Sequence, residues 1–249
     1  MLCVKDLCKQ YKGKRVLDHL SFDVKAQQCV GLVGESGSGK STLGRLILGL
    51  ESAQSGEIMI ENEPLHIWKK HHMGAMSIVF QDYTTSINPR FRVEEILQEP
   101  FWMSQTTLSL ESSHKLLESV ELSASLLKRY AHELSGGQLQ RICLARAIAK
   151  KPRFLLLDEA LSSLDVSIQA QMLQLLRQIR ETYGMTYLFI AHDLESVSAL
   201  CDRFLVLHQG KIVDAIDLGQ VHKETLHPYT KRLLEAVIPF KGVRCHDTN

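Results

Sequence analysis

The stretch Gly34-Glu35-Ser36-Gly37-Ser38-Gly39-Lys40-Ser41, followed by Thr42, decides the fold. It matches G-x-x-x-x-G-K-[ST], in which glycines let backbone N–H groups approach the phosphates of a nucleotide. The apolar run from Cys29 to Val33 predicts a buried strand before the loop, and the run from Leu43 to Leu50 predicts a helix where the loop ends. We therefore expect a nucleoside triphosphate here, with Lys40 on its β- and γ-phosphates and Ser41 on Mg²⁺. The full motif in this context disfavours the alternative, a glycine-rich turn without a ligand.

The bulk composition is that of a globular protein. The 249 residues are 45% hydrophobic and 23% charged, enough for one large domain or two small ones. The net charge of +1 gives no sign of a nucleic-acid-binding surface, so we expect no nucleic-acid partner. No apolar run approaches the roughly 18 residues of a membrane span, and the first residues lack the apolar region of a signal peptide.

The six cysteines and eleven histidines show no spacing typical of metal ligands. There is no C-x-x-C pair, so the cysteines are expected to be reduced thiols rather than a disulfide frame or a zinc site. The pair His71-His72 is interpreted as part of a solvated loop. We therefore expect this chain not to bind a free transition-metal ion.

The order of predicted elements indicates an antiparallel layer beside a parallel, helix-flanked sheet. Strands are expected at Leu2–Leu7, Val16–Val24, Gly56–Ile60, Ser77–Phe80, Phe154–Glu159 and Thr186–Ala191, with a hairpin at Arg203–Ala215. Helices are expected at Val93–Trp102, Ser113–Leu127, Leu139–Ala149 and Val166–Tyr183. About sixty residues from Asn88 onward have no strand-like run, which predicts a helical insertion.

The pentapeptide Leu134-Ser135-Gly136-Gly137-Gln138 is far more selective than the phosphate loop alone. With it, the sequence resembles the ATP-binding-cassette (ABC) ATPases from Tyr11 to His192 and onward. The resemblance implies an α/β fold: a P-loop NTPase (RecA-like) core, an antiparallel β subdomain and an inserted α-helical subdomain. It places the ATP-binding domain at 2–240, its core at 1–87 and 152–240, the helical signature subdomain at 88–151 and a short tail at 241–249.

The resemblance also implies roles for single residues, with ATP and Mg²⁺ as cofactors. Tyr11 resembles the aromatic residue that stacks on adenine, and Gln81 resembles the glutamine that ligates Mg²⁺ and senses the γ-phosphate. Asp158 resembles the carboxylate that holds Mg²⁺, and Glu159 the general base that polarises the attacking water. His192 resembles the histidine that bonds to the γ-phosphate.

Taken singly, these residues have plainer interpretations. Asp158 and Glu159 could cap a helix, His192 before Asp193 could do the same, and Gln81 could simply end a strand.

A second set of residues is expected to serve the nucleotide of an opposing subunit. Ser135, Gly136, Gly137 and Gln138 start a helix with a hydroxyl and backbone N–H groups for a γ-phosphate, and Ser163-Leu164-Asp165 resembles the D-loop that crosses the dimer seam. In this family two cassettes close head-to-tail on two ATP molecules and reopen after hydrolysis. One chain is therefore expected not to complete its own catalytic site.

Two segments resemble the peptide/nickel importer subfamily. They are Gln81-Asp82-Tyr83-Thr84-Thr85-Ser86-Ile87-Asn88-Pro89-Arg90 and His227-Pro228-Tyr229-Thr230-Lys231. This resemblance implies a second ABC ATPase subunit as heterodimer partner, two membrane permease subunits and an extracellular solute-binding protein. It places the chain at the cytoplasmic face of the membrane.

The chain departs from the subfamily pattern at a few positions. Ala160 and Tyr83 each stand where proline is usual, and in the tail Cys245 is the lone cysteine, which argues against an iron–sulfur cluster.

The transported solute is the least determined feature. The segment from Gly136 to Arg146 and the departure at Ala160 are more similar to nickel-import cassettes than to peptide ones. The sequence thus favours nickel or another transition metal, as the ion or as a chelate, over di- or oligopeptides. A distant alternative is a soluble ABC protein that acts in DNA repair or binds ribosomes. Such proteins usually carry two cassettes, a coiled-coil insertion or zinc-binding cysteines, and this sequence shows none of these features. An exporter cassette is disfavoured by the two subfamily segments.

Overall fold

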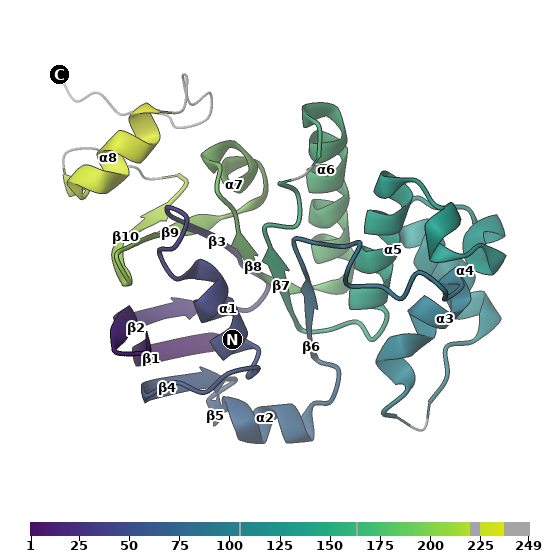
Figure 1. The fold of residues 1–249 in the computed structure, drawn as a ribbon, viewed down its shortest axis with the longest axis horizontal. Coiled ribbons are helices and arrows are strands. Elements are labelled where there is room, and N and C mark those ends of the chain that lie inside the picture. Colours follow the sequence, from purple (N-terminus) through teal and green to yellow (C-terminus); the bar gives the residue numbers. More distant parts are fainter. Residues whose placement is uncertain (105, 163, 220–224, 237–249) are drawn as a thin grey trace. The chain divides into compact units, whose positions relative to one another are not determined.

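A computed structural model describes residues 1–104, 106–162, 164–219 and 225–236 (Figure 1). Contacts along the chain divide it into two compact units, one built from residues 1–72 and those from 186 onward, the other from residues 73–185. Ser163 of the predicted D-loop, and the tail at 241–249 with Cys245, lie outside the described residues. In the described part, every helix is too short or too polar to traverse a lipid bilayer.

The first unit contains an antiparallel sheet with the strand order β2-β1-β4-β5. Its strands are β1 (Leu2–Tyr11), β2 (Lys14–Val24), β4 (Ser55–Ile60) and β5 (Glu63–Pro64), followed by helix α2 (Leu65–His71). Leu2, Val4 and Leu7 of β1 are buried, as expected for a strand with one face on the core. The β1–β2 pairing changes register around Cys8, where the ladder contains a bulge.

The same unit holds three parallel strands in the order β9-β3-β8. They are β3 (Cys29–Val33), β8 (Thr186–Ile190) and β9 (Arg203–His208), and β10 (Lys211–Asp217) pairs antiparallel with β9. Every residue of β3 and β8 is buried, which explains why these strands are nearly continuous apolar runs. The helices are α1 (Lys40–Ile47), α7 (Leu194–Leu200) and α8 (Pro228–Glu235).

The second unit is mostly helical. Its strands β6 (Met76–Val79) and β7 (Phe154–Asp158) are parallel neighbours. Its α-helices are α3 (Val93–Gln98), α4 (Leu110–Ser119), α5 (Gly136–Ile148) and α6 (Val166–Tyr183), and its 3₁₀ turns are η1 (Glu99–Phe101), η2 (Ala124–Lys128) and η3 (Ala131–Glu133). The mixture of α-helices and two sheet types is the predicted α/β fold class.

Two predicted helices are shorter in the structure. The expected helix at Val93–Trp102 ends as an α-helix at Gln98 and continues as a 3₁₀ turn, because Pro100 cannot donate to the α-helical ladder. The expected helix at Ser113–Leu127 ends at Ser119, since Glu121 adopts a left-handed φ of 57°. The helices α2, α7 and α8 were not predicted, and the pair His71-His72 lies at the C-terminus of α2 instead of in a loop.

Candidate functional site

The phosphate loop connects β3 to α1 and approaches the backbone of β9 closely. A Cβ atom added at Gly34 would lie 2.1 Å from the carbonyl oxygen of Leu207 in β9. A Cβ atom at Gly39 would lie 2.6 Å from Cδ2 of Leu17, and Gly39 has a φ of 111°. At these two positions the loop therefore has room only for glycine.

The loop offers donors suited to an anion. Lys40, the first residue of α1, is buried, and its Nζ donates to the carbonyl oxygens of Gly34 at 2.7 Å and Glu35 at 3.1 Å. The Oγ of Ser38 is buried and has no hydrogen-bond partner among the described residues. A buried ammonium and a buried hydroxyl at a helix N-terminus are the groups expected to hold a polyphosphate.

The first turn of α1 also fits the predicted magnesium site. Ser41 is half-buried and follows Lys40, so its hydroxyl belongs to the same helix start as the phosphate donors. Thr42 is buried, and its Oγ1 accepts a hydrogen bond from Arg45 at 3.3 Å. Hydroxyl oxygen beside phosphate is the kind of ligand that Mg²⁺ prefers, so the residues present fit this ion.

His192 lies at the same edge of the parallel strands as the phosphate loop. Ile190 of β8 pairs with Leu32 of β3, so the residues that follow both strands emerge together. The plainer interpretation of His192 as a helix cap is wrong, because Asp193 caps α7 by accepting from the N–H of Ser196 at 2.6 Å. The imidazole of His192 is exposed and is not used by the cap.

Tyr11 ends β1, and the residue is 39% exposed. Its hydroxyl donates to the carboxylate of Glu51, which also pairs with Arg45 at 2.6 Å and Lys9 at 3.2 Å. The Tyr11 hydrogen bond and, after it, the one from Arg45 lower the pKa of Glu51 to about 2. The ring is thus fixed at one end while part of its surface stays accessible, as stacking on a base requires.

In the second unit, the predicted catalytic carboxylates and Gln81 share one edge. Val79 of β6 pairs with Leu157 of β7, so Gln81 and Asp158-Glu159 follow neighbouring strands. Glu159 has a left-handed φ of 46°, and the N–H and Oγ of Ser162 bond to its carbonyl at 3.1 Å and 2.9 Å. Non-glycine residues in this conformation are uncommon and often occur at functional sites.

The signature pentapeptide forms the start of α5. The Ser135 Oγ accepts from the N–H of Gln138 at 3.3 Å, and the Gln138 Oε1 accepts from the N–H of Ser135 at 3.1 Å. This capping box fixes the helix start. A Cβ atom at Gly137 would meet nothing within 4 Å, and one at Gly136 would lie 3.2 Å from the Tyr83 hydroxyl. The helix start is therefore open at Gly137, and Tyr83, which stands where proline is usual, lies beside Gly136.

Asp165 of the predicted D-loop has a structural role. It is the N-cap of α6 and accepts from the N–H of Ile168 at 3.0 Å and the Oγ of Ser167 at 2.9 Å. These hydrogen bonds, the one from Ile168 first, lower its pKa. Its predicted contribution to the nucleotide site of a partner stays a prediction.

Sequence reasoning missed the roles of two further residues near these segments. Arg146 of α5 donates to the carbonyl oxygen of Ser86 at 2.6 Å and to the carboxylate of Glu99 at 2.8 Å, which fixes the segment after Gln81. Tyr229 in α8 is buried, and burial raises its pKa, with a smaller contribution from the charge of Glu35 in the phosphate loop. Tyr229 belongs to the segment from His227 to Lys231 that resembles the peptide/nickel importer subfamily.

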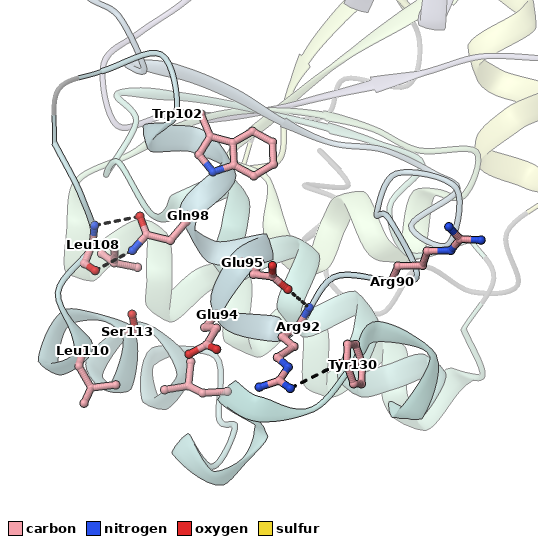
Figure 2. Close-up of a pocket in the computed structure, with 11 residues that line it drawn as sticks. Arg90, Arg92, Glu94, Glu95, Gln98, Trp102, Leu108, Leu110, Ser113 and Tyr130 are labelled. Carbon is pink, nitrogen blue, oxygen red and sulfur yellow. Dashed lines mark hydrogen bonds between the residues drawn. The ribbon is translucent and has the colours of Figure 1, made fainter.

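A hollow of about 740 Å³ in the second unit contains none of the predicted nucleotide-binding residues (Figure 2). Figure 2 shows the guanidinium of Arg92 directed to Tyr130, with Nη2 and Oη 3.4 Å apart. Exposed Trp102 and Leu110 line the hollow as well. Nucleotide binding is thus predicted for the loop and strand edges rather than for this hollow.

Comparisons with known proteins agree with the resemblance to ABC ATPases that the sequence motifs indicate. A sequence model of the family described as ABC transporter matches residues 17–162. The chain is 42% identical over 232 residues to the oligopeptide transport ATP-binding protein OppF of Bacillus subtilis, covering 90% of this chain and 76% of that relative. It is 40% identical over 253 residues to the metal-staphylopine import system ATP-binding protein CntF of Staphylococcus aureus, covering 96% and 100%. A solved structure of the ATP-binding cassette MJ0796, a dimer bound to ADP and Pi, superposes with a TM-score of 0.77 at 26% identity, over 89% of this chain and all of that one.

Proposed function

This chain belongs to the ABC transporter family as the ATP-hydrolysing subunit of an importer, and we propose that it energises uptake of nickel or another transition metal, as the ion or as a small chelate. The likeness to a metal-staphylopine import ATPase over the whole length of that relative supports this proposal most directly. The relatives differ in the solute that their names give, so the proposal concerns the solute and the roles of single residues.

The catalytic proposal assigns the water-activating role to Glu159. Its carboxylate follows β7 beside Asp158, the residue proposed to hold Mg²⁺ together with Ser41 and Gln81. Phosphoryl transfer requires mostly positioning and charge stabilisation, which Lys40, the loop N–H groups and His192 would supply. Glu159→Gln should keep ATP binding and trap a closed dimer. Hydrolysis should fall to less than about a tenth of wild type, because loss of a general base typically costs 10²- to 10⁴-fold.

The assembly proposal follows from the signature helix. The open start of α5 at Gly137 offers backbone N–H groups to a phosphate, but α5 does not directly follow a phosphate loop as α1 does. We assign this start, with Ser135 and Asp165, to the nucleotide held by a second ABC ATPase subunit. Two membrane permease subunits and an extracellular solute-binding protein complete the proposed importer, which would place this chain at the cytoplasmic face of the membrane.

A peptide importer is the second candidate function, because OppF of Bacillus subtilis is 42% identical to this chain. Three features favour the metal proposal: the Ala160 departure, the sequence of α5, and the cysteines, which are single and scattered. The binding protein would capture the solute outside the cell, so the solute would not contact this subunit. The sequence of this subunit therefore reflects the identity of the solute only indirectly.

Deletion of the gene tests the proposal. Cells should lose nickel or cobalt content under metal limitation and keep their growth on peptides, and the wild-type gene should restore the metal content. Normal metal content with reduced peptide uptake would instead support the peptide importer.

A further inference from the structure

Three potential metal ligands meet outside the predicted nucleotide site, on the β1–β2 hairpin. The Sγ of Cys8, a carboxylate oxygen of Asp18 and a ring nitrogen of His19 lie within 4.8 Å of one another. In the part of the chain that the structure describes, no other group of three such residues meets this criterion. Cys8 and Asp18 are half-buried and His19 is exposed, so an ion from solution can reach the group.

The strand pairing explains why these residues meet. Leu7 pairs with Leu20, whereas Lys9 pairs with Leu17, so two residues of β2, Asp18 and His19, lie opposite Cys8 alone. Such a bulge turns neighbouring side chains toward one another. His19 adopts a left-handed φ of 51°, and its N–H donates to the Sγ of Cys8 at 3.3 Å. The bulge thus places the thiol, the imidazole and the carboxylate at one point.

The donor set selects a class of ion. Thiolate and imidazole favour zinc, cobalt or nickel over Mg²⁺ and Ca²⁺, and three protein ligands leave one position open. A second carboxylate, that of Asp6, lies 3.3 Å from Nδ1 of His19 and can orient the ring. We propose that Cys8, Asp18 and His19 form a binding site for one divalent transition-metal ion.

Two neighbouring cations limit the affinity of this site. The Nζ of Lys211 lies 3.2 Å and Nη1 of Arg15 2.6 Å from the Asp18 carboxylate. Each carboxylate oxygen keeps a further lone pair for a metal, but the two cations repel a divalent ion. The site therefore fits a reversible sensor better than a permanently occupied structural centre.

The position of the site connects it to the phosphate loop. Leu17 directly precedes Asp18 and lies against the phosphate loop. A Cβ atom added at Gly39 of the loop would be 2.6 Å from Cδ2 of Leu17. The N–H of Asp18 donates to the carbonyl oxygen of Gly210 at 2.8 Å. An ion that draws Asp18 toward Cys8 would therefore act on the strand that packs against the phosphate loop. This inference does not depend on which solute the importer carries.

Titration of the full-length protein with Co²⁺ tests the site, because thiolate ligation gives a cobalt charge-transfer band. We expect one equivalent of Co²⁺ to produce the band, and Zn²⁺ to displace it. Cys8→Ser should abolish the band, and His19→Gln should weaken binding by more than about tenfold. The matched controls Cys3→Ser, at a half-buried cysteine of the same strand, and His66→Gln, at an exposed histidine, should bind as wild type does.

Two outcomes would overturn the proposal: a band that persists in Cys8→Ser, or equal binding by His19→Gln and His66→Gln. Hydrogen–deuterium exchange with Zn²⁺ then tests the connection to the phosphate loop. The amides of residues 34–42 should change protection in the wild type and not in Cys8→Ser. Metal binding without that change would refute the connection.

Discussion

Gly34→Ala should destabilise the protein through a backbone collision. The new Cβ atom would lie 2.1 Å from the carbonyl oxygen and 3.2 Å from the carbonyl carbon of Leu207. Leu207 belongs to β9, which is hydrogen-bonded to β3 on one side and β10 on the other. Because the colliding atoms belong to the backbone, no side-chain rotation can relieve the contact. The free energy of unfolding should therefore fall by about 3 kcal/mol, the upper part of the range for overpacking.

The assay is the thermal unfolding midpoint of the nucleotide-free protein. For a chain of this length, 1 kcal/mol corresponds to roughly 2–4 °C, so Gly34→Ala should lower the midpoint by about 6–12 °C. Two controls separate collision from backbone strain. Gly37→Ala, with a φ of 79° and nothing within 4 Å, should cost only about 1–2 kcal/mol. Gly137→Ala, in open space at the start of α5, should be neutral or slightly stabilising.

The reasoning would be refuted if Gly34→Ala unfolded within about 2 °C of Gly137→Ala. That result would mean that β9 does not lie against the phosphate loop as closely as the structure indicates. A midpoint equal to that of Gly37→Ala would leave backbone strain as the cause and exclude the collision with Leu207.

Three further predictions concern other parts of the site. Ser135→Arg should leave ATP binding by the isolated subunit intact and abolish hydrolysis by the assembled complex; loss of binding in isolation would mean that Ser135 acts on its own chain's nucleotide. Tyr11→Phe should raise the pKa of Glu51 from about 2 toward 4.5, which an NMR titration would measure. Because the folded state lowers this pKa, the Glu51 carboxylate stabilises the fold above pH 4.5, and this stabilisation is lost as the pH falls to about 2. Arg146→Met should lower the free energy of unfolding, measured by urea denaturation, by about 2 kcal/mol, since Glu99 and the Ser86 carbonyl lose a charged donor. The control Lys115→Met, at an exposed i,i+4 ion pair, should change this free energy by less than about 0.5 kcal/mol.

The phosphate loop and its flanking elements could be predicted because their signal is local. The lysine, the glycines, the preceding apolar strand and the following helix are contiguous in sequence, and the structure shows β3, the loop and α1 in that order. The position of the two proposed catalytic carboxylates was predictable for a similar reason, since Asp158 ends a continuous buried strand and Glu159 directly follows it.

Features that depend on pairing between distant residues were missed. Cys8 and His19 have no ligand spacing in the sequence, and only the bulge between β1 and β2 brings them together. Tyr83 stands where proline is usual, and its hydroxyl lies beside Gly136, 53 positions later in the sequence, a proximity that only the fold creates. The helix α2 was missed because the pair His71-His72 was interpreted as part of a solvated loop. In the structure, buried Trp68 fixes the helix by donating to Glu61 at 3.0 Å.

Nickel accumulation in cells that carry Glu159→Gln in place of the wild-type chain tests the central claim most directly. The claim is that ATP turnover by this subunit drives metal uptake. At equal protein abundance and under metal limitation, the Glu159→Gln cells should accumulate no more nickel than cells that lack the gene. Accumulation at the wild-type level would contradict the claim, because the importer would then work without the proposed catalytic base.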